Sequence, residues 1–338
     1  MAETAPHPDS LPAGESEPDR VALNEPLPAR ESEPSESEAS ERRPKPRASI
    51  GQWLVSAPPL LYLLIFFAAP TLIMVLASFR SPGEFGGLAP IVDETGKLDL
   101  NVDSYVRFVT EPVFVRVFVK SAGYATLTTL FCLLLAYPLA TLIAKSSRKY
   151  RDLLLLLVIL PFWSNFLIRI YAWMIILGPN AALAKLVNGT LALFGAQPVP
   201  LLFSGFAVLV CLVYVSLPFM VLPLYANLEK HDQALLDAAQ DLGANAWQRF
   251  WRITFPLSLP GVYAGAALVF IPALGIFAIP DILGGPEDTL IGNLIKQQFL
   301  ETRDWPFGSV LSIVLTLAAL VLAGAAAWVG RRGPASRA

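Results

Sequence analysis

Six long apolar runs limit the fold more than any other feature of this 338-residue chain. A helix needs about 20 apolar residues to cross a bilayer, and each run is long enough. Because lipid offers no hydrogen bonds, the backbone of each run must be satisfied within the protein, which favours helices. Only 15% of the residues are charged, against about 25% in soluble domains. We therefore predict an all-α polytopic membrane protein with six transmembrane helices, at 54–78, 121–144, 153–177, 205–227, 261–282 and 309–329.

Lysine and arginine are distributed unevenly among the segments that connect these runs. Outside residues 1–41, fourteen lie in one alternating set of segments and eight in the other set, although the loops of the second set are longer. Since cytoplasmic loops are enriched in Lys and Arg, the first set is predicted to be cytoplasmic. Both termini and the polar loop 229–260 then lie on the inner side of the membrane.

The first 48 residues differ in composition from the rest of the chain. Segment 1–41 holds eleven acidic residues and two arginines, and segment 1–48 has few large apolar groups. Such a segment cannot bury enough apolar surface to offset its conformational entropy, so we predict a disordered acidic cytoplasmic tail at 1–48. It also lacks the apolar stretch of a signal peptide. A six-helix transmembrane domain is expected at 49–333.

The residues that usually build catalytic or metal centres are scarce. His7 and His231 are far apart in the sequence, and Cys132 and Cys211 both lie inside apolar runs. Neither pair has the spacing of a metal site. The chain also lacks the GxxxxGK[ST] motif of a phosphate-binding loop. We expect no catalytic residue, no metal, no cofactor and no nucleic-acid partner, so the chain is not expected to be an enzyme.

Loop 229–260 has the pattern of two short helices joined by a tight turn. Asp232 is a good N-cap for a helix that starts at Gln233, and Gly243 stands where a helix C-cap favours a left-handed residue. The small side chains of Ala238 and Ala239 would let a partner surface approach the first helix closely.

The second helix of the loop is expected at about 245–253. Pro256 and Pro260 follow it and are expected to stop it before the next membrane run. Trp247 and Trp251 leave an alternative open, because an amphipathic helix with tryptophans can also lie flat on the membrane surface.

The stretch "DAAQDLG", followed after nine residues by "ITFP", resembles the EAA signature of ABC importer permeases. Two positions depart from that signature, since Asp237 replaces the usual Glu and Phe255 replaces the usual Leu. The resemblance implies a type I permease fold whose loop 229–260 is a coupling helix that docks on an ATPase. The residues that match are Asp237, Ala238, Ala239, Gly243, Ile253 and Pro256.

Three further stretches resemble permeases of spermidine/putrescine importers, a polyamine subfamily. They are "LPFWSNFLIRIYAW" (160–173), "LVYVSLPFMVLPLYANLEK" (212–230) and "GGPEDTLIGNLIKQQFLETRDWPFG" (284–308). This resemblance implies a bacterial inner-membrane protein that works with two ABC ATPase subunits, a second permease subunit and a periplasmic substrate-binding protein. It leaves open whether the permease pair is a heterodimer or a homodimer.

A polyamine is a flexible polycation, which suits carboxylates and aromatic rings. Candidates for its path are Trp163, Asn165, Tyr171 and Asp281, and an acid within an apolar run is a functional candidate. Arg169 is expected to pair with Asp281 and to help close an outer gate. The aromatic residues could equally belong to an interfacial belt.

Two other functions are considered. A permease for another small solute, such as ferric iron or sulfate, has the same overall pattern, but an anion path should show basic or helix N-terminal donors. A membrane enzyme or channel is disfavoured, because no acid/base cluster lies in the apolar runs and a channel needs no loop for docking an ATPase.

Overall fold

The computed structural model describes residues 50–90, 92 and 100–332. The predicted acidic tail at 1–48 therefore lies outside the described residues. The chain divides into two units, residues 1–62 and 63–338. The described residues contain isolated β-bridges, such as the one between Pro82 and Leu88, but no β-strand. The described part is therefore built from helices, as predicted.

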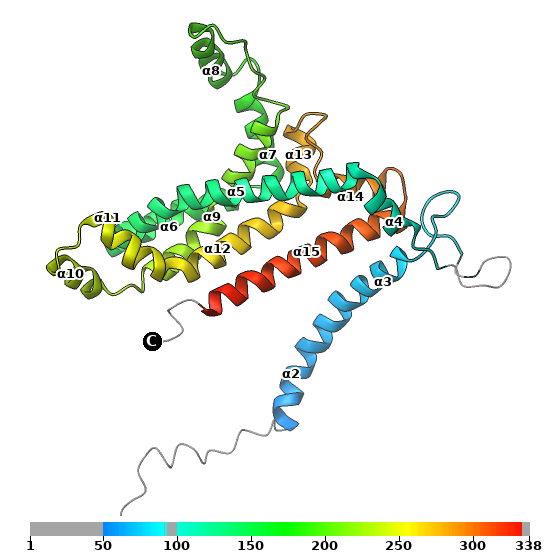
Figure 1. Ribbon diagram of the computed structural model, residues 1–338, viewed down its shortest axis with the longest axis horizontal. Coiled ribbons are helices and arrows are strands. Elements are labelled where there is room, and N and C mark those ends of the chain that lie inside the picture. The colour runs from blue at the N-terminus through cyan, green and yellow to red at the C-terminus, as the bar shows by residue number, and fades with distance from the viewer. Residues whose placement is uncertain (1–49, 91, 93–99, 333–338) are drawn as a thin grey trace, which may run out of the picture. The chain divides into compact units, whose positions relative to one another are not determined.

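The helices follow one another along the chain, and the connection between α3 and α4 is longer than most (Figure 1). Two π-helical segments, Leu64–Ala68 and Phe250–Thr254, and a 3-10 turn, Leu160–Trp163, interrupt them. The α-helices are α2 (Ile50–Leu63), α3 (Ala69–Ser78), α4 (Asp103–Thr110), α5 (Pro112–Lys145), α6 (Arg148–Ile159), α7 (Phe166–Leu177), α8 (Ala182–Leu193), α9 (Gly205–Leu228), α10 (Gln233–Asp241), α11 (Ala246–Arg249), α12 (Phe255–Gly275), α13 (Ala278–Leu283), α14 (Ile291–Leu300) and α15 (Trp305–Arg332).

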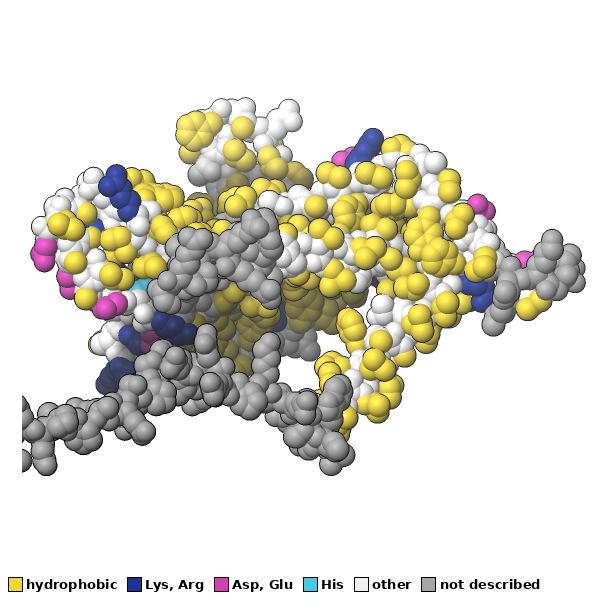
Figure 2. Space-filling view, turned by 60° about the horizontal axis from the view of Figure 1, so that its bottom comes forward, with side chains coloured by type: hydrophobic (Ala, Val, Ile, Leu, Met, Phe, Trp, Pro, Cys, Tyr) yellow, Lys and Arg dark blue, Asp and Glu magenta, His cyan; other side chains and the backbone are white. Residues whose placement is uncertain are grey.

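Six helical stretches in the described residues are long and apolar enough to cross a membrane, which confirms the predicted number. They are Ser56–Ser78, Pro112–Lys145, Phe166–Leu193, Gly205–Leu228, Ala246–Gly275 and Trp305–Ala325. Their outer surfaces remain apolar, and Figure 2 shows hydrophobic side chains over most of the described surface on the face drawn. Leu134 is 68% exposed, for example, and Ile175 is 76% exposed. Such surfaces suit lipid or a partner subunit rather than water.

Two predicted membrane helices are broken in the structure. The run at 153–177 forms α6, the 3-10 turn and α7, because Pro161 lacks an N–H for a regular helix and Asn165 starts a new one by accepting a 2.8 Å hydrogen bond from the N–H of Leu167. The run at 261–282 starts earlier than predicted, at Phe255 in α12, and breaks after Gly275 before α13 begins. The third membrane-length stretch is accordingly formed by α7 and α8 instead of residues 153–177.

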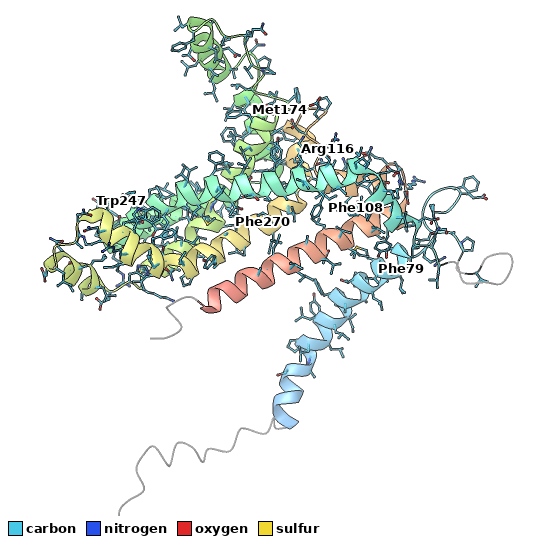
Figure 3. All side chains as sticks on the ribbon, viewed as in Figure 1. Phe79, Phe108, Arg116, Met174, Trp247 and Phe270 are labelled. Atoms are coloured by element: carbon cyan, nitrogen blue, oxygen red, sulfur yellow. The ribbon has the colours of Figure 1, made fainter. Side chains whose placement is uncertain are left out.

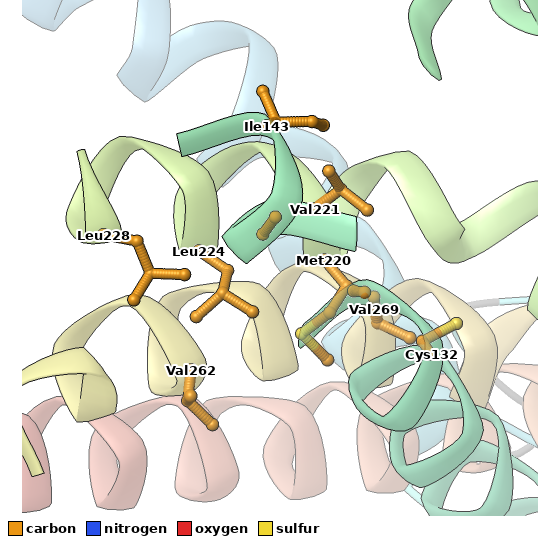
Figure 4. Packing of buried hydrophobic residues seen from close by; sticks show 10 residues of the cluster. Cys132, Ile143, Met220, Val221, Leu224, Leu228, Val262 and Val269 are labelled. Atoms are coloured by element: carbon orange, nitrogen blue, oxygen red, sulfur yellow. The ribbon is translucent and has the colours of Figure 1, made fainter. Parts of the chain in front are cut away.

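Helices α5, α9 and α12 pack against one another and form a large buried hydrophobic cluster (Figure 4). Two glycines of α12 permit this close approach. A Cβ at Gly261 would lie 2.7 Å from the Cβ of Asn227, and one at Gly265 would lie 2.7 Å from the Sδ of Met220. Small residues play this role in membrane proteins, where packing rather than water exclusion holds helices together.

We predict that Gly261→Leu destabilises the protein, because the new side chain must displace α9 backbone and side-chain atoms. Overpacking of this kind costs about 1–3 kcal/mol, so the midpoint of thermal unfolding in detergent should fall. Gly123→Leu is the matched control, since nothing lies within 4 Å of a Cβ built on that α5 glycine. Equal effects of both substitutions would contradict this account of α12 packing.

Candidate functional site

The loop between α9 and α12 begins with the short helix α10. The side chain of Asp232 accepts a 2.9 Å hydrogen bond from the N–H of Ala234 and so caps the helix. Gly243 ends it with a φ of +81°, a left-handed conformation that L-residues with a Cβ rarely adopt. The predicted start, cap and turn of this helix are confirmed.

Helix α10 presents an apolar and small-residue surface that no other described element covers. Leu242 is 89% exposed and Leu235 is 52% exposed. Asp237 and Ala238 are also exposed, while Ala239 is half-buried. Exposed leucines beside small residues are typical of a surface that a partner protein covers.

The second half of the loop corrects the prediction that Pro256 and Pro260 end a helix. Asn245 and Gln248 form a reciprocal capping box at the start of α11, and helical structure then continues through the π-helical segment into α12. Pro256 lies in the first turn of α12 and has no N–H to donate to a preceding carbonyl. The turn before it is π-helical and wider, so the helix can continue without that hydrogen bond. The loop is therefore joined rigidly to a membrane helix, and Ile253 and Pro256 are half-buried within that junction.

Aromatic side chains connect this junction to α5. The ring of Tyr137 lies 5.3 Å from that of Phe250 between centroids, and Trp251 lies 5.1 Å from Phe255. The hydroxyl of Tyr137 is also within 2.9 Å of the Ser258 Oγ, a hydrogen-bonding distance. Trp247, labelled in Figure 3, is 70% exposed, so contact of this tryptophan with the membrane surface stays open.

Polar contacts fix the loop at its inner end. The Arg249 guanidinium donates a 2.6 Å hydrogen bond to the Gln240 Oε1 and so ties α11 to α10. Arg151 pairs with Glu229 and ties α6 to the end of α9. A cavity of about 340 Å³ lies beneath the loop and is lined in part by Asp237. A push on α10 would therefore act on several membrane helices together.

The intramembrane acid candidate, Asp281, lies in α13 directly after the break that follows α12. Its Oδ1 accepts a hydrogen bond from the Asn293 side chain, and its Oδ2 lies 2.6 Å from the Lys296 Nζ. This differs from the predicted pairing with Arg169. The guanidinium of Arg169 instead lies over the ring of Phe162, 5.2 Å from its centroid. The break in the helix turns α14 back over Asp281 and makes Lys296 the available cation.

The aromatic path candidates do not gather around Asp281 in this structure. Trp163 is 75% exposed in the 3-10 turn and Tyr171 is 50% exposed on α7. Asn165 serves as the N-cap of α7. None of the hydrogen bonds, ion pairs and ring contacts found within residues 50–90, 92 and 100–332 joins these three side chains to Asp281. Their place in a substrate path stays a prediction.

Sequence reasoning missed Asn293 and Lys296. They follow Asp281 by 12 and 15 residues and lie beyond a Gly-Gly-Pro turn, so no helical period connects them to it. The signal in the sequence that could have pointed to Asn293 is its polar amide between two apolar residues, Gly292 and Leu294.

Comparison with known proteins places these features in context. Residues 136–332 match the family model described as binding-protein-dependent transport system inner membrane component. The chain is 43% identical over 258 residues to the spermidine/putrescine transport system permease protein PotB of Escherichia coli K12, which covers 76% of this chain and 89% of that protein. PotB of Haemophilus influenzae is 41% identical over 256 residues, covering 76% and 86%. The molybdenum transport system permease protein ModB of Mycobacterium bovis is 30% identical over 236 residues, covering 67% and 82%.

Solved structures with the same fold include a chain of a bacterial ABC transporter involved in the import of the acidic polysaccharide alginate. The TM-score is 0.64 at 22% sequence identity, with 83% of this chain and 96% of that chain covered. At this identity the likeness supports the fold and nothing further. The predicted permease fold with six membrane helices is thereby confirmed.

We predict that Asp232→Ala loosens α10, because the helix loses its N-cap. The cost should be about 1 kcal/mol, and hydrogen exchange of the amides at 233–241 should accelerate about fivefold. Asp241→Ala is the control on the same helix, since an acid in the last turn opposes the helix dipole and its removal should not loosen the helix. Unchanged exchange in Asp232→Ala would show that tertiary contacts alone hold α10.

Proposed function

Because the chain belongs to the family of binding-protein-dependent transport system inner membrane components, and is thus a permease subunit of an ATP-driven importer, we propose that its cargo is a polyamine such as spermidine or putrescine. The observation that carries this proposal is the similarity to spermidine/putrescine permeases, which extends over most of both chains. The weaker similarity to a molybdenum permease makes an oxyanion the second candidate cargo. The two candidates differ in the sign of the cargo's charge.

The proposed assembly contains this chain, a second permease subunit, two ABC ATPase subunits and a periplasmic binding protein that delivers the polyamine. In this assembly both termini and the loop 229–260 lie on the cytoplasmic side. The excess of Lys and Arg in the inner segments supports that orientation. The exposed leucines of α10 support the proposal that α10 docks on an ATPase subunit.

The loop would convert closure of the ATPases into movement of the membrane helices. Asp237, Ala238, Ala239 and Gly243 lie in the part that would contact the ATPase, and Ile253 and Pro256 lie in the junction that continues into α12. A load on α10 would pass to α11 across the turn at Gly243 and through the hydrogen bond between Arg249 and Gln240. It would then reach α12 through continuous helix and α5 through the contact between Tyr137 and Ser258. Rigid helices and packed aromatic rings suit this transmission because they have few soft degrees of freedom.

The outer site has the chemistry that a polyamine requires. Asp281 is an oriented carboxylate beside a cavity of about 540 Å³. A carboxylate attracts an ammonium group, whereas it would repel sulfate or molybdate. This electrostatic preference supports a polyamine over the oxyanion alternative.

We predict that Gly243→Asp abolishes transport-coupled ATPase activity while the protein still inserts into the membrane. The substitution strains a left-handed turn and places a charged side chain on the proposed docking surface. Gly195→Asp is the matched control, because Gly195 also has a positive φ of +70° and open space around a Cβ. Normal coupled turnover in Gly243→Asp would contradict the docking role.

The cargo can be tested with the complete transporter reconstituted into proteoliposomes. Spermidine and putrescine, supplied with the binding protein, should stimulate ATP hydrolysis several-fold, whereas sulfate and molybdate should not. Stimulation by an oxyanion alone would overturn the proposed polyamine cargo and favour the second candidate.

A further inference from the structure

Asn293 holds the Asp281 carboxylate in place without the help of a cation. Its side chain is 8% exposed and accepts a 3.2 Å hydrogen bond from the N–H of Leu290. Its Nδ2 donates to the carbonyl of Phe277 at 2.9 Å and to the Oδ1 of Asp281. The amide is therefore fixed on both sides, and the carboxylate would keep its orientation if Lys296 moved away.

Lys296 contacts Asp281 in a different manner. Its ammonium reaches the Oδ2 at 2.6 Å through a flexible side chain, and about a third of each side chain is exposed. The hydrogen bond to Asp281 raises the pKa of Lys296 above its ordinary value, so this amine stays charged at neutral pH. A partly exposed ion pair of this kind contributes little stability, which makes the cation exchangeable.

A second carboxylate, that of Glu301, lies near the Lys296 ammonium. The Oε1 of Glu301 lies 3.9 Å from the same Nζ, and the Glu301 side chain is 58% exposed. Lys296 can therefore leave Asp281 and keep a carboxylate nearby. Among the described residues, Lys296 is the one cation that forms an ion pair with Asp281, so this carboxylate needs another cation once Lys296 departs.

The cavity beside Asp281 fits the stem of a polyamine. It has a volume of about 540 Å³, and its lining combines Asp281 with the apolar surfaces of Phe203, Pro280 and Pro286. Phe203 is 57% exposed and has a φ of +55°, an unusual conformation for a bulky residue. An aromatic ring next to a carboxylate can bind an ammonium group and its methylenes together.

We propose that Lys296 is a resident ammonium group that neutralises Asp281 when no substrate is present, and that an arriving polyamine ammonium displaces it toward Glu301. This inference rests on the proposed polyamine cargo. It makes Lys296 a specificity-determining residue, because only a ligand that carries a cation of the same kind can exchange with it. A neutral or anionic solute would leave the pair between Lys296 and Asp281 intact.

The nearby pair of Lys120 and Asp288 shows what a structural ion pair looks like in this protein. Asp288 also accepts hydrogen bonds from the Tyr124 hydroxyl and the N–H of Gly285, and Lys120 also donates to the carbonyl of Glu287. Both partners therefore make hydrogen bonds in addition to the ion pair. Lys120 therefore provides the matched control for Lys296.

The test is spermidine uptake by proteoliposomes that carry the complete transporter, measured over a range of spermidine concentrations with a fixed amount of binding protein. Lys296→Met removes the competing cation and should lower the half-saturating concentration about two- to fivefold, the range expected for a partly exposed ion pair. Lys296→Arg and Lys120→Met should not lower it. Asp281→Asn should raise it roughly tenfold or more, and adding Lys296→Met to Asp281→Asn should then have no further effect.

A structural ion pair gives a different pattern, because loss of either partner would then impair uptake in the same direction. A half-saturating concentration that is unchanged or raised in Lys296→Met overturns the inference. Should Lys296→Met fail to accumulate in the membrane, Lys296→Gln provides the same test, since its amide keeps a hydrogen-bond donor for Asp281. Failure of the wild-type transporter to import spermidine would instead overturn the proposed function itself.

Discussion

A bilayer cannot hydrogen-bond to backbone, and the helices of this protein depend on that constraint. Wherever a membrane run breaks, the freed groups have to find partners inside the protein. Asn165 satisfies the start of α7 after one break, and Asn293 bonds the carbonyl of Phe277 after another. The second break brings the start of α14 so close that a Cβ at Gly292 would lie 2.4 Å from the carbonyl oxygen of Gly275. Asn293 therefore has two roles, because it donates to a backbone carbonyl at this break and also orients the Asp281 carboxylate.

Helix α12 connects the two candidate sites. At its N-terminal end it continues without interruption through the π-helical segment into α11, and at its C-terminal end it stops beside the segment that carries Asp281. Its glycines let it lie directly against α9, and the hydroxyl of its Ser258 meets Tyr137 on α5. A single stiff element therefore has an end at the proposed ATPase surface and another near the proposed substrate carboxylate. A small movement at one end of α12 would therefore have a direct route to the other end.

Local patterns in the sequence predicted local structure well. The start of α10 at Gln233, its cap at Asp232 and its left-handed end at Gly243 depend on residues within a few positions of one another. Predictions that depended on wider surroundings were less successful. Pro256 was expected to end a helix, yet the π-helical turn before it lets the helix continue. The docking of α10 on an ATPase and the roles of Trp163 and Tyr171 in a substrate path depend on partner chains and stay predictions.

The sequence by itself determined the number of membrane helices, the start, cap and turn of α10 and the family, because each of these rests on composition, spacing or short motifs. Only the tertiary structure decided which cation meets Asp281. The sequence offers both Arg169 and Lys296 as cations, and charge alone could not choose between them. The break after Gly275 and the return of α14 bring Lys296 within 2.6 Å of the carboxylate, while Arg169 packs over Phe162. That choice depends on how two chain segments fold back on each other, which no periodicity in the sequence encodes.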